Sequence, residues 1–380
     1  MATRDLRLYE LRSLSDMETI RDTWKRLVLS APTTTSSQTW EWNFGMAKFE
    51  GSRVSLRILV AEDKCGEQVG IAPLLIRSSS VPGLKILEFL GRGEYSDLFS
   101  LEPYKDIFAR SVMEWIEHNT EWRILRLQNL RQETVDLICR YGSFTIRPSG
   151  VCPRAQLPNT MEEYEQKILQ KRLRQKIRQK RKLLAGNGRL AFSVCGTTSQ
   201  LLAELPVFID LHQRRQRMKG ERGRFFEERW REAFQEISLA LLQAGFLRLG
   251  LLRIDGQPAA SLYNVRFRDH ECFCYGGMAP SFAEYSPGNL LHHYMIEEAI
   301  RDGVRVYDFL KGDEPYKSLW TNDRCQLFEI VQARSRAEGI LWHKTESLRN
   351  IVYRSRLIKR VYLATMGRLQ NIRGKENDAH

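Results

Sequence analysis

Apolar residues recur at two spacings along the first half of the chain, about 3.6 residues in some segments and two in others. Residues 15–29 have the helical spacing, with Ser15 placed to cap the helix and Glu18 as its reciprocal partner. Residues 55–62 and 68–77 alternate as strands around an Asp-Lys-Cys-Gly turn, which predicts a hairpin. The other predictions here are helices over 40–49 and 104–119 and strands over 85–90, 95–100 and 123–128.

The second half repeats this alternation after a proline-containing stretch at 148–158, which shows no periodicity. Helices are predicted over 161–185, 201–219, 226–244 and 288–302, and strands over 190–194, 246–254, 257–268, 271–278 and 304–310. We interpret the chain as two copies of one architecture, a largely antiparallel sheet flanked by helices. The expected fold class is α/β (α+β), with domains over 1–155 and 156–338 and a basic helical tail over 339–380.

Two segments combine an apolar stripe with many basic residues. Residues 167–182 contain nine Lys or Arg among sixteen, and the tail is basic again from about 339 to 372. Such a helix suits an anionic lipid surface, nucleic acid or an acidic substrate, and it equally suits a solvated edge of the domain. Aromatic residues are missing among the charges of 167–182, so stacking on bases is not indicated.

Composition narrows the class of protein. The chain is 42% hydrophobic and 28% charged, without an apolar run near the ~20 residues of a membrane-spanning helix and without a secretory signal pattern, so we expect a cytoplasmic protein. The net charge of +13 predicts an anionic partner. Seven scattered cysteines without a C-x-x-C pair argue against a zinc site, and no metal is expected.

The order strand, loop, helix over residues 275–291 is typical of a phosphate site. Ser286 is placed as the helix cap and Pro287 as the first helical residue, where its missing N–H is not needed. Gly288 leaves room for a phosphate beside the exposed N–H groups of the first turn. The candidate cofactor-binding residues are therefore Ser286, Gly288, Asn289 and Leu290, although an ordinary capped helix has the same pattern.

A charged and aromatic loop follows the strand over 304–310, and strand ends are where α/β sheets place ligands. Asp308 and Asp313 are candidates to accept a proton from an attacking amine or hydroxyl, and Tyr316 could donate to an oxyanion or a leaving thiolate. A salt-bridged surface turn would have the same composition. The candidate substrate-binding residues are Glu314, Lys317 and Trp320.

His212 and Arg215 share one face of the helix over 201–219. His212 is a candidate general base because an unperturbed imidazole titrates near neutrality, although a structural role fits the position as well. Arg215 and Arg217 are candidates to contact an anionic substrate.

These segments carry a resemblance to a known family. The chain over residues 8–335 resembles the CelD-like branch of the GNAT superfamily, whose members are described as acetyltransferases linked to cellulose or other exopolysaccharide biosynthesis. It is also similar in architecture to Fem-type peptidyltransferases, which have two GNAT-like domains. The matching positions are Phe208, Leu211, His212, Arg215, Tyr275–Met278, Pro280, Tyr285–Leu291 and Tyr307–Trp320, with Trp40–Trp42, Gly70–Leu74 and Tyr95–Asp97 in the first half.

The sequence also departs from the family pattern. The GNAT pyrophosphate signature Q/R-x-x-G-x-G/A is absent before the helix, where only Gly288 remains, and Gln216 stands where the family has Trp. By resemblance, Lys317 takes the position at which Fem-type enzymes bind substrate phosphates, so we expect it to contact an anion.

The resemblance implies an acyltransferase that uses acetyl-CoA or another acyl-CoA as co-substrate and an unspecified acceptor, for example an amino sugar. We expect direct attack without a covalent enzyme intermediate, because no Cys or Ser stands beside an evident base. Two alternatives stay open. One is a Fem-like transferase using aminoacyl-tRNA, with RNA as partner. The other is a non-catalytic accessory protein of a polysaccharide synthesis machine. In each case the basic tail could hold the protein peripherally at the inner membrane.

Overall fold

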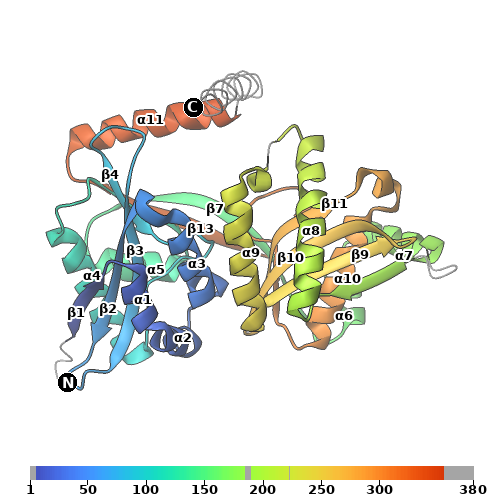
Figure 1. Cartoon of the computed structure of the whole chain (residues 1–380), viewed down its shortest axis with the longest axis horizontal. Coiled ribbons are helices and arrows are strands. Elements are labelled where there is room, and N and C mark those ends of the chain that lie inside the picture. The colour runs from blue at the N-terminus through green and yellow to red at the C-terminus, as the bar shows by residue number, and fades with distance from the viewer. Residues whose placement is uncertain (1–5, 185–189, 222, 355–380) are drawn as a thin grey trace, which may run out of the picture.

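The computed structural model describes residues 6–184, 190–221 and 223–354. It contains one continuous 13-stranded sheet in the order β1-β2-β3-β4-β6-β13-β7-β12-β11-β10-β9-β8, with β5 paired to β3. Figure 1 shows an amino-terminal half on the left and a carboxy-terminal half on the right, with β7 and β13 running between them. The predicted fold class, a mixed sheet flanked by helices, is confirmed.

The two halves have the same strand pattern. In the first, four antiparallel strands are followed by a crossover helix and a strand parallel to the fourth. These elements are β1 (Arg7–Leu11), β2 (Val54–Glu62), β3 (Gln68–Ser78), β4 (Lys85–Phe89), α4 (Lys105–His118) and β6 (Ile124–Leu130). The second half repeats them as β8 (Leu190–Val194), β9 (Leu247–Ile254), β10 (Gln257–Phe267), β11 (His270–Met278), α10 (Pro287–Arg301) and β12 (Val306–Asp308).

Each half receives its sixth strand from the other part of the chain. β7 (Thr145–Gln156) follows β6 in sequence but pairs with β12, and β13 (Asp323–Ala333) follows β12 but pairs with β6. We call β7 and β13 the exchanged strands, and they also pair with each other. The stretch at 148–158, for which no helix or strand was predicted, is therefore a strand as far as Gln156. The register shifts opposite Pro148, which is where a strand tolerates a proline.

Two predicted helices are each divided in the structure. The helix predicted over 15–29 is α1 (Leu14–Thr19) and α2 (Arg21–Ser30), and the helix predicted over 161–185 is α6 (Met161–Lys167) and α7 (Lys171–Leu184). The first part of 15–29 is capped reciprocally by Ser13 and Asp16 rather than by Ser15 and Glu18. The strand predicted over 95–100 is shortened to β5 (Phe99–Ser100). The remaining helices are α3 (Trp40–Glu50), α5 (Gln132–Ile138), α8 (Thr198–Met218), α9 (Glu228–Gln243) and α11 (Arg336–Arg354).

The carboxy-terminal sheet is covered on both faces. Helices α8 and α9 bury one apolar cluster against β9 and β10, and α6, α7 and α10 bury another on the opposite face. The halves also touch through α3 and α9, where a Cβ on Gly45 would lie 2.2 Å from Ile237. Trp342 attaches α11 to the amino-terminal half. The predicted tail beyond residue 354 lies outside the described residues.

Candidate active site

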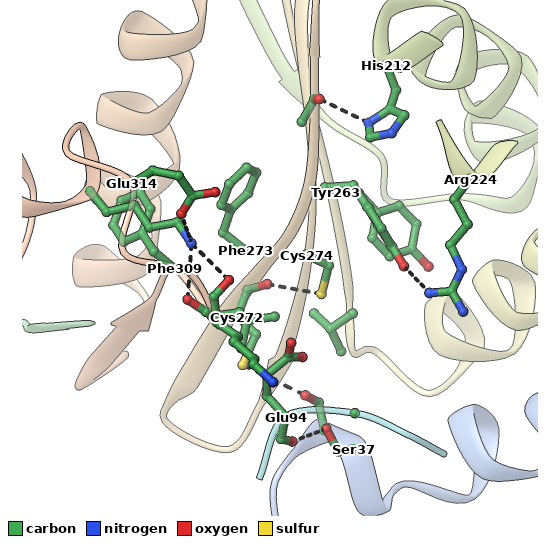
Figure 2. Close-up of a pocket in the computed structure, with 18 of the residues that line it drawn as sticks. Ser37, Glu94, His212, Arg224, Tyr263, Cys272, Phe273, Cys274, Phe309 and Glu314 are labelled. Atoms are coloured by element: carbon green, nitrogen blue, oxygen red, sulfur yellow. Dashed lines mark hydrogen bonds and ion pairs between the residues drawn. The ribbon is translucent and has the colours of Figure 1, made fainter. Parts of the chain in front are cut away.

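A cavity of about 390 Å³ opens between the two halves. Its walls come from α8, from β11, from the loop that follows β12, and from the segments 36–37 and 92–95 of the amino-terminal half. Figure 2 shows Glu94 and Ser37 on the amino-terminal wall, with His212 and Arg224 on a second wall and Glu314 with Phe309 on a third. The exchanged strands hold these walls together because they continue the sheet from one half into the other.

The cavity lies where β11 and β12 diverge. The two strands pair in parallel over His270–Cys272 and Val306–Asp308. β11 then continues to Met278, whereas the chain after Asp308 turns away. The backbone N–H of Phe309 donates to Pro153 of β7, and Leu310 has a left-handed φ of 53°. This divergence leaves an open space beside β11.

Asp308 is fully buried beneath this space and does not line the cavity. Its Oδ2 accepts a hydrogen bond from Tyr95 Oη at 2.5 Å and lies 3.1 Å from His270 Nε2, while Oδ1 accepts from the backbone N–H of Leu310 at 2.7 Å. Both oxygens are thus occupied. We expected Asp308 to be a base for the acceptor, and the structure gives it instead the role of joining Tyr95 of one half to β12 of the other.

Besides Glu314, the cavity wall carries the carboxylate of Glu94, which the sequence analysis did not select. Burial raises the pKa of this carboxyl, the nearby Asp308 adds to the increase, and Lys311 and Lys317 oppose it. No ion pair reaches its side chain from the residues that the structure describes. A half-buried carboxyl with a raised pKa, facing a cavity, is a stronger base than an ordinary glutamate and a candidate to accept a proton.

The loop around Glu94 is held tightly. Ser37 Oγ donates to the Glu94 carbonyl at 2.6 Å, and a Cβ on Gly93 would lie 2.3 Å from that hydroxyl, so only glycine fits. Arg92 and Tyr95 on either side have left-handed φ values of 47° and 61°. Strain of this kind persists where surrounding contacts impose it. The sequence signal was the pair of glycines around Arg92, which marks a turn but does not show what the turn faces.

His212 lies on the cavity wall but is poorly suited to be the base. Burial lowers its pKa to about 4, and the charge of Arg215 adds to this effect. Nδ1 lies 3.1 Å from the Gly276 carbonyl, to which it donates in the neutral ring, and Nε2 then accepts from the Gln216 side chain at 3.2 Å. The ring is therefore neutral at pH 7 with both nitrogens engaged, and its role is to join α8 to β11.

Arg215, Tyr316 and Glu314 all line the cavity. Arg215 Nη1 donates to the Gly276 carbonyl at 3.4 Å. Burial raises the pKa of Tyr316, so its hydroxyl keeps its proton and can donate. Glu314, with its side chain 54% exposed, pairs with Lys317 at 2.9 Å.

Lys317 also reaches the cavity, but its ammonium is committed to the loop. Besides Glu314, Nζ donates to the carbonyls of Leu310, Lys311 and Gly312 at 3.2–3.3 Å, and the residue is 3% exposed. The expected contact with a substrate phosphate is therefore not supported. Lys317 shapes the loop that closes one side of the cavity.

Two other expected site residues lie away from the cavity. Asp313 is exposed and pairs with Arg324 at 3.5 Å, and Trp320 is completely buried in the core beside Phe309 and His292. An indole buried in this way cannot contact a ligand. The aromatic pattern of this loop reflects packing more than binding.

The expected cofactor residues form the start of α10, outside the cavity lining. Ser286 occupies the cap position in a left-handed conformation with φ 53°, and its side chain makes no capping hydrogen bond. Its carbonyl accepts from the N–H groups of Asn289 and Leu290, and the Leu290 side chain is buried. A Cβ on Gly288 would meet no atom within 4 Å. The position that a side chain at residue 288 would occupy is therefore open.

Comparison with known families identifies the part of the chain that builds three of the cavity walls. Residues 171–318 match the family model described as acetyltransferase (GNAT) domain. This segment is similar to GNAT acetyltransferase domains. The GNAT match covers α8, β11, α10 and the loop after β12, and it confirms the prediction of a GNAT-type transferase.

Solved structures extend the likeness to both halves. FemX is similar over 81% of this chain and 95% of its own, with 12% identity and a TM-score of 0.61. The carboxy-terminal domain of a protein from Agrobacterium fabrum that is described as a lysylphosphatidylglycerol synthetase is also similar. The likeness covers 88% of this chain and 96% of that domain, with 12% identity and a TM-score of 0.56. L-PGS from Bacillus licheniformis is similar over 84% and 92%, with 11% identity and a TM-score of 0.52. At these identities the likeness establishes the fold.

No curated protein matches the chain by sequence. Across the helices that the structure describes, none has the length and apolar character needed to cross a membrane.

Proposed function

We propose that the protein transfers an acyl group from an acyl-CoA, with acetyl-CoA as the first choice, to an amine or hydroxyl acceptor bound in the cavity. The observation that carries this proposal is Glu94, a carboxyl with a raised pKa on the cavity wall opposite the GNAT domain. Glu94 takes the proton of the acceptor as it attacks the acyl carbonyl. Tyr316, which burial keeps protonated, donates to the leaving thiolate.

The donor would be held in part by the start of α10. The Gly288 N–H and the positive end of the helix dipole favour a phosphate there, and open space surrounds the position. When bound, the acyl-CoA supplies the thioester carbonyl that the acceptor attacks. The protein's part is to orient the acceptor and to move its proton.

Calorimetric titration with acetyl-CoA and with coenzyme A tests the donor, using Gly288→Glu and the matched control Gly288→Ala. A side chain at 288 meets no neighbour, so both variants should fold. We expect Gly288→Glu to weaken binding by roughly tenfold or more through repulsion of the phosphates, and Gly288→Ala to bind like the unchanged protein. Equal binding by Gly288→Glu would move the donor away from α10.

If neither ligand binds, the Fem-like alternative with aminoacyl-tRNA becomes the better supported one. The basic helix α7 supports this alternative. Lys171, Arg172, Lys176 and Lys182 are exposed on this helix and form no ion pair with the described residues. Co-purifying RNA, measured as the ratio of absorbance at 260 to 280 nm, separates this alternative from an acyl-CoA enzyme.

A place in cellulose or exopolysaccharide biosynthesis, and a peripheral position on an anionic membrane, are further parts of this proposal. On α11, Ile340, Leu341 and Leu348 are 57%, 47% and 62% exposed, which suits contact with a lipid surface. Sedimentation with anionic vesicles tests the membrane contact, and the absence of salt-sensitive binding would remove it.

A further inference from the structure

The lining of the cavity is strongly positive. Among the described lining residues, six are cationic and two are acidic, which gives a net charge of +4 with both carboxylates ionised. A cleft of one sign raises the local concentration of ligands of the opposite sign. The cations are Arg92, Arg215, Lys219, Arg224, Lys311 and Lys317, and the acids are Glu94 and Glu314.

Three of these cations already have partners. Arg92 pairs with Glu88, Lys317 with Glu314, and Lys311 donates to the side chain of Asn129. Among the residues that the structure describes, Arg215, Lys219 and Arg224 form no ion pair. Their charge is therefore available to a ligand.

The three available cations come from the end of α8 and the segment that follows it, and two of them are oriented. Arg215 lies on the last turn of α8, and Lys219, four residues further on, caps the end of the helix on the same side. Arg215 is fixed by the Gly276 carbonyl, and the Arg224 guanidinium lies 4.3 Å from the centre of the Trp230 ring and donates to Tyr275 Oη at 3.3 Å. Guanidinium groups held in this way suit phosphate or carboxylate oxygens.

We propose that the acceptor is an anionic amine or alcohol, bearing a phosphate or carboxylate that binds Arg215, Lys219 and Arg224. Its nucleophile then lies at Glu94, which belongs to the wall contributed by the other half (Figure 2). The position of the nucleophile rests on the proposed function. The anion site rests only on the three cations.

Calorimetric titration with inorganic pyrophosphate and with malonate, as phosphate and carboxylate probes, tests the anion site. We expect Arg215→Gln, Lys219→Gln and Arg224→Gln each to weaken binding of at least one probe by about tenfold, the loss of one hydrogen bond to a charged group. Arg217→Gln is the matched control, because Arg217 is exposed on α8 but does not line the cavity. An equal loss in Arg217→Gln, or no loss in the three variants, would overturn the site.

A second titration separates acceptor from donor. We expect pyrophosphate to bind with the same affinity when acetyl-CoA is saturating, whereas competition would assign the cations to the donor's phosphates and overturn the proposal. If acetyl-CoA does not bind, the donor proposal fails and the variants still decide the anion site. Glu94→Gln removes a negative charge from the cavity and should not weaken probe binding, so a failure of the base and a failure of the anion site are distinguishable.

Discussion

Glu94 and His212 face the same cavity with pKa values that burial moves in opposite directions. Removing water disfavours the charged form of each group, which raises the pKa of the Glu94 carboxyl and lowers that of the His212 imidazole to about 4. At neutral pH the imidazole is therefore an uncharged structural link between α8 and β11. The carboxyl becomes the stronger base of the two.

Glu94→Gln is expected to reduce turnover by about 10²–10⁴-fold, the usual contribution of a positioned general base. Because the base must be ionised, the rate of the unchanged enzyme should fall as the pH drops through a value above the ordinary ~4.3 of a glutamate. Release of the coenzyme A thiol, followed across pH with a panel of acceptors, measures both effects. The exposed Glu102→Gln serves as control, and an acidic limb that persists in Glu94→Gln would assign it to another group.

Residue patterns located Arg215, Glu314 and Tyr316, which lie on the cavity wall because a helix face and a strand end place them there. They could not locate Glu94. Its chemistry depends on Asp308, Lys311 and Lys317, more than 200 residues further along the chain, and only the packed halves bring those groups near. Trp320 shows the opposite error, since a core residue had the appearance of a binding one.

At the scale of elements, the close approach of α8 to β11 fixes the position of the cavity wall that α8 contributes. A Cβ on Gly277 would lie 2.4 Å from the backbone nitrogen of His212 and 2.5 Å from the carbonyl carbon of Leu211. Backbone at this distance cannot give way as a side-chain tip can. The absence of a side chain at 277 therefore positions both His212 and Arg215.

Gly277→Ala should push α8 away from the sheet and lower the free energy of unfolding by about 1–3 kcal/mol. Urea denaturation measures this loss, and pyrophosphate affinity should fall with it because Arg215 moves. Gly288→Ala adds the same methyl group in open space and should leave stability nearly unchanged. Equal stability of the two variants would show that α8 adapts without strain.

Elements closed by local turns were predicted well, whereas those defined by distant partners were not. The hairpin of β9 and β10 follows from its Asp-Gly turn and the alternation on either side. β7 has prolines and little alternation, and its pairing partners begin about 150 residues away, as in the contact of Cys152 with Cys325. A single sequence contains no signal for such pairing.

At the scale of the whole molecule, the exchanged strands make the two halves one folding unit. A chain ending at residue 322 lacks β13, so β6 and β7 would each have an unpaired edge. We expect this chain to lose the cooperative urea transition and to aggregate. A chain ending at residue 335 keeps β13 and loses α11, so it should retain one transition at a lower urea midpoint. An unaltered transition in the shorter chain would show that the halves fold separately.

The exchanged strands also bear on how an acceptor is selected. Two halves joined by a flexible linker can close around a ligand, and the distance between their walls then adjusts to the molecule that is bound. Here backbone hydrogen bonds run through β13, β7 and β12 from one half to the other, so the span from Arg215 to Glu94 exists before any ligand arrives. Such a site selects by length, favouring molecules whose charge and nucleophile are separated by that span, and discrimination would need no induced fit.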